Sequence, residues 1–272
     1  KDGDAWETVE RSGIGRALAH KLEREGWQVV ASARSKDKLD ELSGKDCGIG
    51  HITAYPLDVT DQAKASAAIS DIEALHGPIA MAVFNAGVFK PEHGEDLQLH
   101  DYINTFNVYL YGVVYSLIPL VNAMKARQMG QIALVSSVTG YGGLPSSAAY
   151  GATKAALINM AESLKFDFDK MGILLQVINP GFVDTPATEE NAFELPALVS
   201  VETAANLFAQ GLKRNRFEIT FPMRFTYTLK SLQFLPYRAY FWLLNRSTGW
   251  KNRPLKGNVS EPQSVPEVSA AE

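Results

Sequence analysis

Short apolar runs alternate with longer amphipathic stretches along most of this sequence. The runs fall at 29–32, 52–55, 81–84, 132–135 and 174–178, and helix-length stretches flank them at 14–25, 61–76, 98–127 and 150–170. A strand that is apolar along its whole length is typical of a parallel sheet, because both of its faces are buried. We therefore predict an α/β fold with a doubly wound parallel sheet, whose ligands bind at the carboxyl ends of the strands.

The composition is that of one domain in a reducing compartment. The 272 residues are 46% hydrophobic, which is enough for a large core, and the single cysteine, Cys47, excludes an internal disulfide. No apolar run approaches the roughly 18 residues of a membrane span, and no signal peptide is visible. The sequence starts at Lys1, so we expect that the natural N-terminus is missing or processed. These features predict a cytoplasmic protein.

A tyrosine and a lysine stand four residues apart in the segment Tyr150-Gly151-Ala152-Thr153-Lys154. On a helix this spacing places both side chains on one face. An ammonium beside a phenol favours the phenolate, which lowers the tyrosine pKa from about 10 and prepares it for proton transfer. Chance often produces the spacing, but here Ser136 and Ser137 end the preceding apolar run and Asn179-Pro180-Gly181 ends the following one. Together these features predict a catalytic site.

The segment Ser12-Gly13-Ile14-Gly15 opens a predicted helix. Free backbone N–H groups and the helix dipole at such a position attract anions, and glycine lets the backbone approach phosphate groups closely. We therefore predict that this segment binds the pyrophosphate of a dinucleotide.

These motifs resemble those of the short-chain dehydrogenase/reductases and, within that family, bacterial oxidoreductases of unassigned substrate. The resemblance covers about residues 12 to 220 and includes Asp58-Val59 and Asn85-Ala86-Gly87. It implies a Rossmann-like domain over residues 1–220 and a homo-oligomer. We expect an aromatic and basic extension over 221–254 and, from its content of Ser, Pro, Val and Glu, a disordered tail over 255–272.

The resemblance also implies a nicotinamide dinucleotide cofactor. NAD-preferring relatives carry an acidic residue after the second strand, whereas Arg34 stands here, and its planar guanidinium suits a 2′-phosphate. NADP is therefore expected rather than NAD. The alternative is that Arg34 is only a solvated loop residue. The residues expected to bind the cofactor are Ser12, Gly13, Ile14, Gly15, Arg34, Asp58, Val59, Asn85, Ala86, Gly87, Tyr150, Lys154, Pro180, Gly181, Val183 and Thr185.

By the same resemblance, Ser137, Tyr150 and Lys154 are the catalytic residues, and no metal is expected. Tyr150 exchanges a proton with the substrate oxygen, and Ser137 holds that oxygen by a hydrogen bond. Lys154 lowers the pKa of Tyr150 and binds the nicotinamide ribose.

The N-terminal segment departs from the family pattern. Thr8 matches the family's Thr-Gly pair, but Val9 replaces the glycine, and a β-branched residue resists the turn that glycine permits. The preceding residues Asp4-Ala5-Trp6-Glu7 make a poor buried strand. Residues 1–11 are therefore either an atypical N-terminus or a working loop of altered sequence.

A second departure falls at Tyr109. Family members carry an asparagine three residues before a glycine, here Gly112, and it holds a water molecule that connects to the catalytic lysine. Tyr109 stands at that position, and Asn107 lies about 200° around the helix, so we expect it to face elsewhere. The proton relay of the family is thus in question.

The C-terminal region is basic and aromatic. Residues 213–256 contain ten Lys and Arg, one Glu and ten aromatic residues, in a chain whose net charge is −4. This combination is typical of contact with an anionic membrane surface. A lid over the substrate cleft is the alternative, and the two can coexist. Nucleic-acid binding is not expected, because the rest of the chain is acidic and shows no recognition module.

We therefore expect an NADP-dependent carbonyl reductase or alcohol dehydrogenase with an apolar, lipid-like substrate, in the cytoplasm or at the inner face of a membrane. The substrate class rests on the side chains expected to flank the site, which are Tyr141, Leu144, Phe182 and Phe193. The alternative is a non-catalytic, dinucleotide-binding or membrane-docking protein on a degenerate scaffold. Val9 and Tyr109 favour that alternative, whereas Ser137, Tyr150 and Lys154 oppose it.

Overall fold

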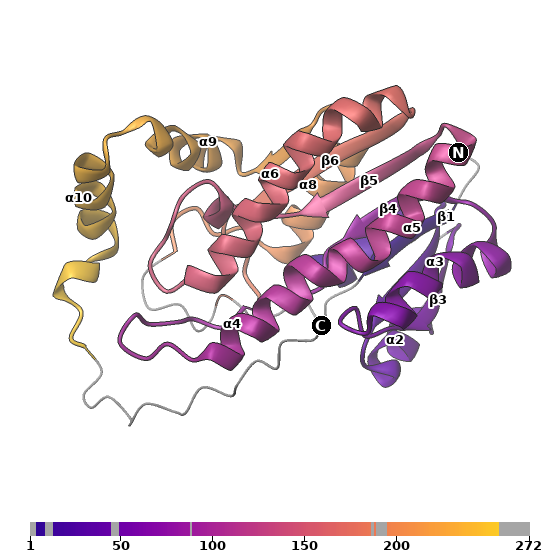
Figure 1. Cartoon of the computed structure of the whole chain (residues 1–272), viewed down its shortest axis with the longest axis horizontal. Coiled ribbons are helices and arrows are strands. Elements are labelled where there is room, and N and C mark those ends of the chain that lie inside the picture. The colour runs from indigo at the N-terminus through magenta and orange to yellow at the C-terminus, as the bar shows by residue number, and fades with distance from the viewer. Residues whose placement is uncertain are drawn as a thin grey trace, which may run out of the picture.

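The computed structural model describes residues 4–8, 13–44, 49–87, 89–185, 188 and 195–255. Seven parallel strands form one sheet in the order β3-β2-β1-β4-β5-β6-β7, with helices on both faces (Figure 1). The predicted doubly wound fold is confirmed. The strands are β1 (Asp4–Thr8), β2 (Gln28–Ala33), β3 (His51–Pro56), β4 (Ile79–Phe84), β5 (Gly130–Val135), β6 (Ile173–Pro180) and β7 (Glu218–Phe221).

Two apolar clusters bury the two faces of the sheet. Leu18 and Phe208 belong to the cluster under the helices α1, α2 and α8, and Ile72, Leu120 and Leu157 belong to the one under α3, α5 and α6. The described helices are α1 (Ile14–Arg24), α2 (Lys36–Ser43), α3 (Gln62–His76), α4 (Leu99–Phe106), α5 (Gly112–Arg127), α6 (Ala148–Lys170), α8 (Val201–Leu212), α9 (Met223–Ser231) and α10 (Tyr237–Thr248). Shorter helical segments are η1 (Asn107–Tyr111), η2 (Val138–Gly140), η3 (Leu232–Phe234) and η4 (Trp250–Asn252).

All five predicted apolar runs lie inside strands, from β2 to β6, and the predicted helices correspond to α1, α3, the stretch from α4 to α5, and α6. The segment η1 is π-helical and joins α4 to α5 in one continuous helix. By length and composition, this helix over Leu99–Arg127 could cross a membrane. Val113, Leu117 and Leu120 pack in the core, however, as in the core helix of a globular domain, which passes the same test.

The N-terminal residues form a strand, contrary to the prediction. β1 is the third strand of the sheet and pairs with β2 on one side and β4 on the other. The indole of Trp6 is fully buried, donates a hydrogen bond to Ser32 Oγ at 2.9 Å and packs edge-on against Phe84. Backbone pairing on both sides and the burial of Trp6 therefore outweigh the two acidic residues that argued against a strand. Val9 lies outside the described residues.

The segment after β7 projects beyond the end of the sheet and contains α9 and α10, which are orange to yellow in Figure 1. β7 ends at Phe221, the first residue of the predicted extension, and only Leu255 of the predicted tail is described. The division into domain, extension and tail stays a prediction.

A half-buried polar network fastens α9 to the sheet. Glu218 Oε1 accepts hydrogen bonds from the Tyr141 hydroxyl at 2.6 Å and from Asn179 Nδ2 at 2.7 Å, and Lys230 Nζ lies 2.6 Å from Glu218 Oε2. Burial alone raises the pKa of Glu218, but the hydrogen bonds from Lys230, Tyr141 and Asn179 together outweigh it and lower that pKa. Burial and the bond to Glu218 raise the pKa of the Tyr141 phenol. The carboxylate is thus kept charged as the centre of the network.

Glu7 is fully buried in β1, and neither of its carboxylate oxygens has a hydrogen-bond partner among the residues that the structure describes. Burial raises the pKa of Glu7 well above its ordinary value of 4.5. Between the ordinary pKa of 4.5 and the raised pKa of the folded state, Glu7 keeps its proton in the folded protein and loses it in the unfolded chain. The contribution of Glu7 to the free energy of unfolding therefore falls as pH rises through this range.

We predict that Glu7→Gln raises the free energy of unfolding near pH 8 by about 1–3 kcal/mol relative to the original chain, and by less near about pH 4. The amide keeps the shape of the side chain and removes its ionisation. Denaturant unfolding at both pH values measures the difference, with Glu41→Gln on the exposed face of α2 as control. An equal effect of the two substitutions at each pH would contradict the prediction.

Candidate active site

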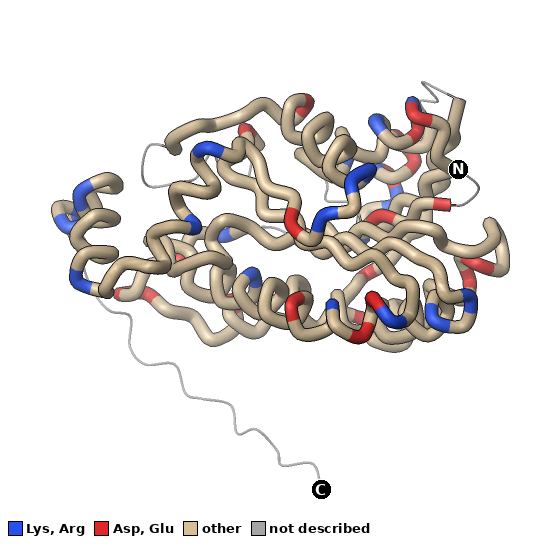
Figure 2. Tube along the Cα trace, turned by 90° about the horizontal axis from the view of Figure 1, so that it is seen from above, with Lys and Arg blue, Asp and Glu red and all other residues tan. Residues whose placement is uncertain are grey.

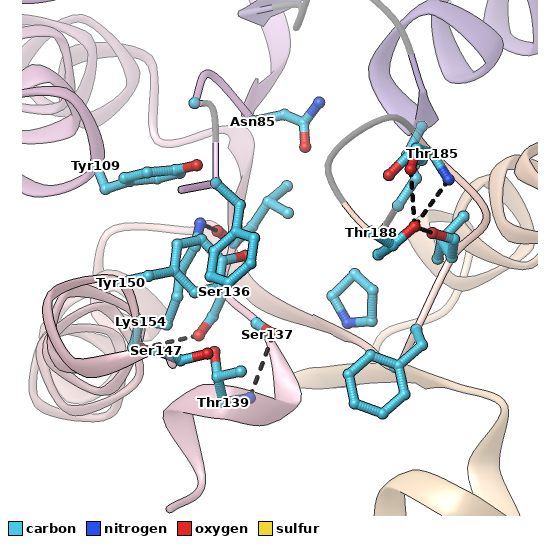
Figure 3. Close-up of a pocket in the computed structure, with 18 of the residues that line it drawn as sticks. Asn85, Tyr109, Ser136, Ser137, Thr139, Ser147, Tyr150, Lys154, Thr185 and Thr188 are labelled. Carbon is cyan, nitrogen blue, oxygen red and sulfur yellow. Dashed lines mark hydrogen bonds between the residues drawn. The ribbon is translucent and has the colours of Figure 1, made fainter. Parts of the chain in front are cut away.

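The predicted catalytic residues meet where three neighbouring strands end. Ser137 follows β5, Pro180 ends β6, and Asn85 follows β4. Tyr150 and Lys154 reach the same place from the first turns of α6 (Figure 3). The carboxyl ends of parallel strands lie at one edge of a sheet, which is where such folds bind ligands.

Ser137, Tyr150 and Lys154 line one cavity of about 140 Å³, which we call the catalytic cavity. Ser137 begins the short helix η2, and its Oγ accepts a hydrogen bond from the backbone N–H of Thr139 at 3.2 Å. The ring of Phe89 packs edge-on against the ring of Tyr150, with the centroids 5.1 Å apart. The structure therefore brings together the three residues that the sequence predicted to act as one unit.

Lys154 is buried, with only 4% of its surface exposed. Its ammonium donates a hydrogen bond to the carbonyl of Val135 at 2.7 Å, and its own backbone carbonyl accepts one from Ser136 Oγ at 2.8 Å. Both bonds join α6 to the end of β5. The ammonium lies 5.3 Å from the centroid of the Tyr150 ring, as the four-residue spacing predicted.

Tyr109 lies against both of these residues. The Lys154 ammonium is 4.4 Å from the centroid of its ring, within the range of a cation–π interaction, and the ring meets that of Tyr150 edge-on at 5.1 Å. Tyr109 belongs to the π-helical segment η1, and π-bulges inside α-helices are frequent at functional sites. Asn107 does not line this cavity, in agreement with the expectation that it faces elsewhere.

The ring of Tyr109 explains the glycine at position 87. A Cβ at Gly87 would lie 1.9 Å from the Tyr109 Cε1 atom and 2.6 Å from its hydroxyl oxygen. No side chain fits at that distance. The Asn-Ala-Gly motif after β4 therefore lets a tyrosine ring pass over the backbone beside Lys154.

A second cavity, of about 830 Å³, runs along the ends of β2, β3 and β4. Gly87 and Tyr109 line both cavities, so the two are neighbours across these residues. Arg34 is exposed and lines this second cavity. Further predicted cofactor residues on its wall are Asp58, Val59 and Ala86.

The glycine segment lies at the start of α1. Gly13 has a φ of 86°, a left-handed conformation that favours glycine, and Ile14 lines the catalytic cavity. A Cβ at Gly13 would lie 3.0 Å from the Thr185 Cγ2 atom, and Gly15 is buried under the helix. Ser12 lies outside the described residues, so its predicted contact with phosphate stays a prediction.

The remaining predicted cofactor residues follow β6. Pro180, Gly181, Val183 and Thr185 all line the catalytic cavity. Thr188, which the sequence analysis missed, accepts a hydrogen bond from the Thr185 N–H at 3.0 Å and donates one to the Val183 carbonyl at 2.7 Å. No sequence spacing marked it, because its role depends on the local turn.

The apolar wall of the catalytic cavity differs in part from the prediction. Leu144 and Phe182 line it as expected, and Phe89 was missed. Tyr141 does not line it, because its hydroxyl is bound to Glu218. Phe193 lies outside the described residues.

A third cavity of about 670 Å³ adjoins the catalytic one. Thr139, Leu144 and Ser147 line both. Its other wall includes Phe241 and Leu244 of α10. An apolar space thus extends from the catalytic residues to the C-terminal helix.

Comparisons with known proteins identify the family. The sequence model described as short chain dehydrogenase matches residues 8–194. An uncharacterized oxidoreductase of Myxococcus xanthus is 32% identical over 228 residues, which cover 83% of this chain and 89% of that protein. A 3-oxoacyl-[acyl-carrier-protein] reductase of Thermotoga maritima is 32% identical over 180 residues, which cover 66% and 73%.

Solved structures share the fold. A short-chain dehydrogenase from Streptomyces avermitilis aligns with a TM-score of 0.75 at 23% identity and covers 90% of this chain and 97% of its own. One from Sphingobium yanoikuyae in complex with NADPH aligns with a TM-score of 0.74 at 19% identity, covering 95% and 99%. The chain belongs to the short-chain dehydrogenase family, whose members are oxidoreductases that use a nicotinamide dinucleotide.

We predict that Gly87→Ala lowers the free energy of unfolding by about 1–3 kcal/mol, because its Cβ overlaps the ring of Tyr109. In a Tyr109→Ala background, the same substitution should cost clearly less. Thermal or denaturant unfolding of the two single variants and the double variant gives the coupling free energy. Gly94→Ala is the control, because a Cβ there meets nothing within 4 Å. Costs that add to within about 0.5 kcal/mol would show that the ring does not lie over Gly87.

Proposed function

We propose that this protein is an NADP-dependent oxidoreductase that transfers a hydride between nicotinamide and a carbonyl or alcohol carbon of an apolar substrate. The observation that carries the proposal is the meeting of Ser137, Tyr150 and Lys154 in one cavity, with the cavity lined by Arg34 beside it. A proton donor, a hydrogen-bond donor and a buried cation then stand next to a space suited to a dinucleotide.

The residues around both cavities fit such a cofactor. The N-terminus of α1 after Gly13 offers backbone N–H groups to a pyrophosphate, and the cavity along β2, β3 and β4 has Arg34 on its wall. Arg34 offers its guanidinium to a 2′-phosphate. A structural relative is described with NADP bound, and another with NADPH. Bound there, the reduced cofactor supplies the hydride, and the oxidised cofactor accepts one.

The side chains of this chain account for the proton. In the reduction direction, Tyr150 donates its phenolic proton to the carbonyl oxygen, which becomes the hydroxyl of the product alcohol. Ser137 donates a hydrogen bond to the same oxygen and orients the substrate. The Lys154 ammonium stabilises the phenolate that remains. The reverse steps serve alcohol oxidation.

Tyr109 serves in this proposal as a positioning residue. Its ring covers the Lys154 ammonium at 4.4 Å, on the side where relatives hold a water molecule through an asparagine. Together with the Val135 carbonyl, it confines the ammonium next to Tyr150. In this proposal, the Tyr109 ring contacts the Lys154 ammonium in place of the water molecule that the family resemblance implies.

The walls of the cavities support an apolar substrate. Phe89, Leu144, Phe182 and Val183 surround the catalytic cavity, and the adjoining cavity continues along α10. A relative is named as a reductase of 3-oxoacyl groups, which are carbonyls on acyl chains. We therefore propose a carbonyl or alcohol on an extended apolar chain. A non-catalytic scaffold is not favoured, because the three catalytic side chains lie together.

Tyr150→Phe tests the proposed chemistry. The variant should lose about 10²–10⁴-fold in turnover, because the proton donor is removed, while its affinity for NADPH stays close to that of the original chain. Turnover is measured with a panel of apolar ketones of increasing chain length, and NADPH binding is measured by fluorescence titration. Tyr111→Phe, on the exposed face of η1, is the matched control. Full activity in Tyr150→Phe would refute the assigned mechanism.

Arg34→Asp tests the choice of cofactor. The substitution should weaken NADPH binding by roughly tenfold or more, because a charge-assisted contact is lost and a like charge is introduced. Affinity for NADH should stay the same or improve. Lys36→Asp makes the same charge change two residues further on and should have a much smaller effect. If both variants weaken both cofactors equally, Arg34 does not recognise the 2′-phosphate.

A further inference from the structure

The segment from α9 to η4, residues 223–252, carries cations without acids. We call it the C-terminal helical segment. It contains no carboxylate, whereas the whole chain has a net charge of −4. Figure 2 shows Lys and Arg, and no Asp or Glu, on the helix at the left end of the molecule, which is α10. Its cations are Arg224, Lys230, Arg238, Arg246 and Lys251.

One side of α10 is fastened to the body of the protein. Leu244 is buried, and the Tyr240 hydroxyl donates a hydrogen bond to the carbonyl of Gly143 at 2.8 Å. After the helix, Trp250 stacks on His93, and Arg253 pairs with Glu95 at 2.6 Å. These contacts hold α10 in place beside the third cavity, as the lid alternative expected.

The side of α10 that carries Arg238, Trp242 and Arg246 is exposed, and the Trp242 ring lies 5.9 Å from the Arg246 guanidinium carbon. Tyr237 and Phe241, four residues apart and stacked on each other, are exposed along the edge between this side and the fastened one. Tyr237 is 80% exposed and Trp242 is 64% exposed. We call the stripe formed by Tyr237, Arg238, Phe241, Trp242 and Arg246 the outer face of α10. Phe234, directly before the helix, is exposed as well.

Aromatic rings beside arginines match the boundary of a bilayer. Trp and Tyr are favoured at the level of lipid headgroups, and an amphipathic helix lies there with its aromatic side chains inserted and its cations beside anionic headgroups. Cations near such a surface contribute to binding individually. A helix already fixed to the body through Tyr240 and Leu244 can present this face without unfolding.

A second copy of the chain fits the outer face less well. A symmetric contact places the same patch on both sides of the interface. It would bring Arg238 and Arg246 of one copy toward those of the other, and the C-terminal helical segment supplies no carboxylate between them. An anionic lipid surface supplies the missing negative charge.

We propose that the outer face of α10, with Phe234, docks the protein on an anionic lipid bilayer. Phe241 belongs both to this face and to the wall of the third cavity. The docked protein thus holds that apolar cavity next to the lipid. The docking itself does not depend on the proposed catalytic activity.

Co-sedimentation with vesicles tests the proposal. The full chain should pellet with vesicles of phosphatidylcholine mixed with phosphatidylglycerol, should not pellet with phosphatidylcholine alone, and should be released as salt rises. Removing one cation from such a surface costs roughly fivefold in affinity. The double variant R238E/R246E should therefore lose roughly 30-fold or more.

A matched control separates this face from overall charge. K36E/K38E makes the same charge change on α2, at the far edge of the sheet from α10 (Figure 1), and should bind vesicles like the original chain. An equal loss of vesicle affinity in both double variants would overturn the proposal. It would show that the net charge of the protein, and not the outer face of α10, determines binding. Unchanged thermal unfolding of each variant verifies that it is folded.

Tryptophan fluorescence gives a second measurement that needs no charge reversal. Lipids brominated near the headgroup should quench the original chain, and W242F should remove most of that quenching. Of the other three tryptophans, Trp6 is fully buried, Trp27 is half-buried against the core and Trp250 is half-buried against His93. The absence of any binding to anionic vesicles at low salt would overturn the proposal. The proposal would also be overturned if the protein does not pellet with vesicles but self-associates in solution, and W242F abolishes that self-association. The outer face would then bind a second copy of the chain.

Discussion

The buried ammonium of Lys154 constrains much of the catalytic site. A charge with 4% exposure has to be solvated by the protein, and the Val135 carbonyl at 2.7 Å and the aromatic rings of Tyr109 and Tyr150 do this. These contacts tie α6 to the end of β5 and to the π-helical segment η1. Gly87 follows from the same arrangement, because only a residue without a Cβ leaves space for the Tyr109 ring. The contacts that solvate the Lys154 ammonium thus also hold it beside Tyr150, as the proposed proton transfer requires.

A second, half-buried charge plays the corresponding role at the C-terminal end. Glu218 gathers Tyr141, Asn179 and Lys230 and so fixes α9 against β6 and β7. Tyr141 therefore does not line the catalytic cavity, beside which the sequence analysis had expected it, but it does line the third cavity. α10 is held separately, by the hydrogen bond from Tyr240 to Gly143 and by the burial of Leu244 beside the third cavity. The outer face of α10 stays exposed next to these contacts.

Most of the sheet was predictable because its strands β2 to β6 are buried on both faces and are therefore apolar throughout. β1 was not, since Asp4 and Glu7 lie in it and its place depends on pairing with β2 and β4. The short strand β7 was missed as well. The meeting of Ser137, Tyr150 and Lys154 could be predicted because Tyr150 and Lys154 share a helix face and Ser137 closely follows a strand. The places of Phe89 and Thr188 could not be predicted, because neither belongs to a motif or a spacing that marks it.

The sequence by itself determined the fold class, the grouping of Ser137 after β5 with Tyr150 and Lys154 on α6, and the basic and aromatic character of the C-terminal segment. These are properties of residue type and spacing along the chain, which local geometry converts directly into structure. Only the tertiary structure decided what Tyr109 and Tyr141 contact and which side of α10 faces outward. Tyr109 covers Lys154, and Tyr141 turns to Glu218, because each contact joins segments that are far apart in the sequence. Such contacts depend on how the elements pack, and no spacing between neighbouring residues encodes them.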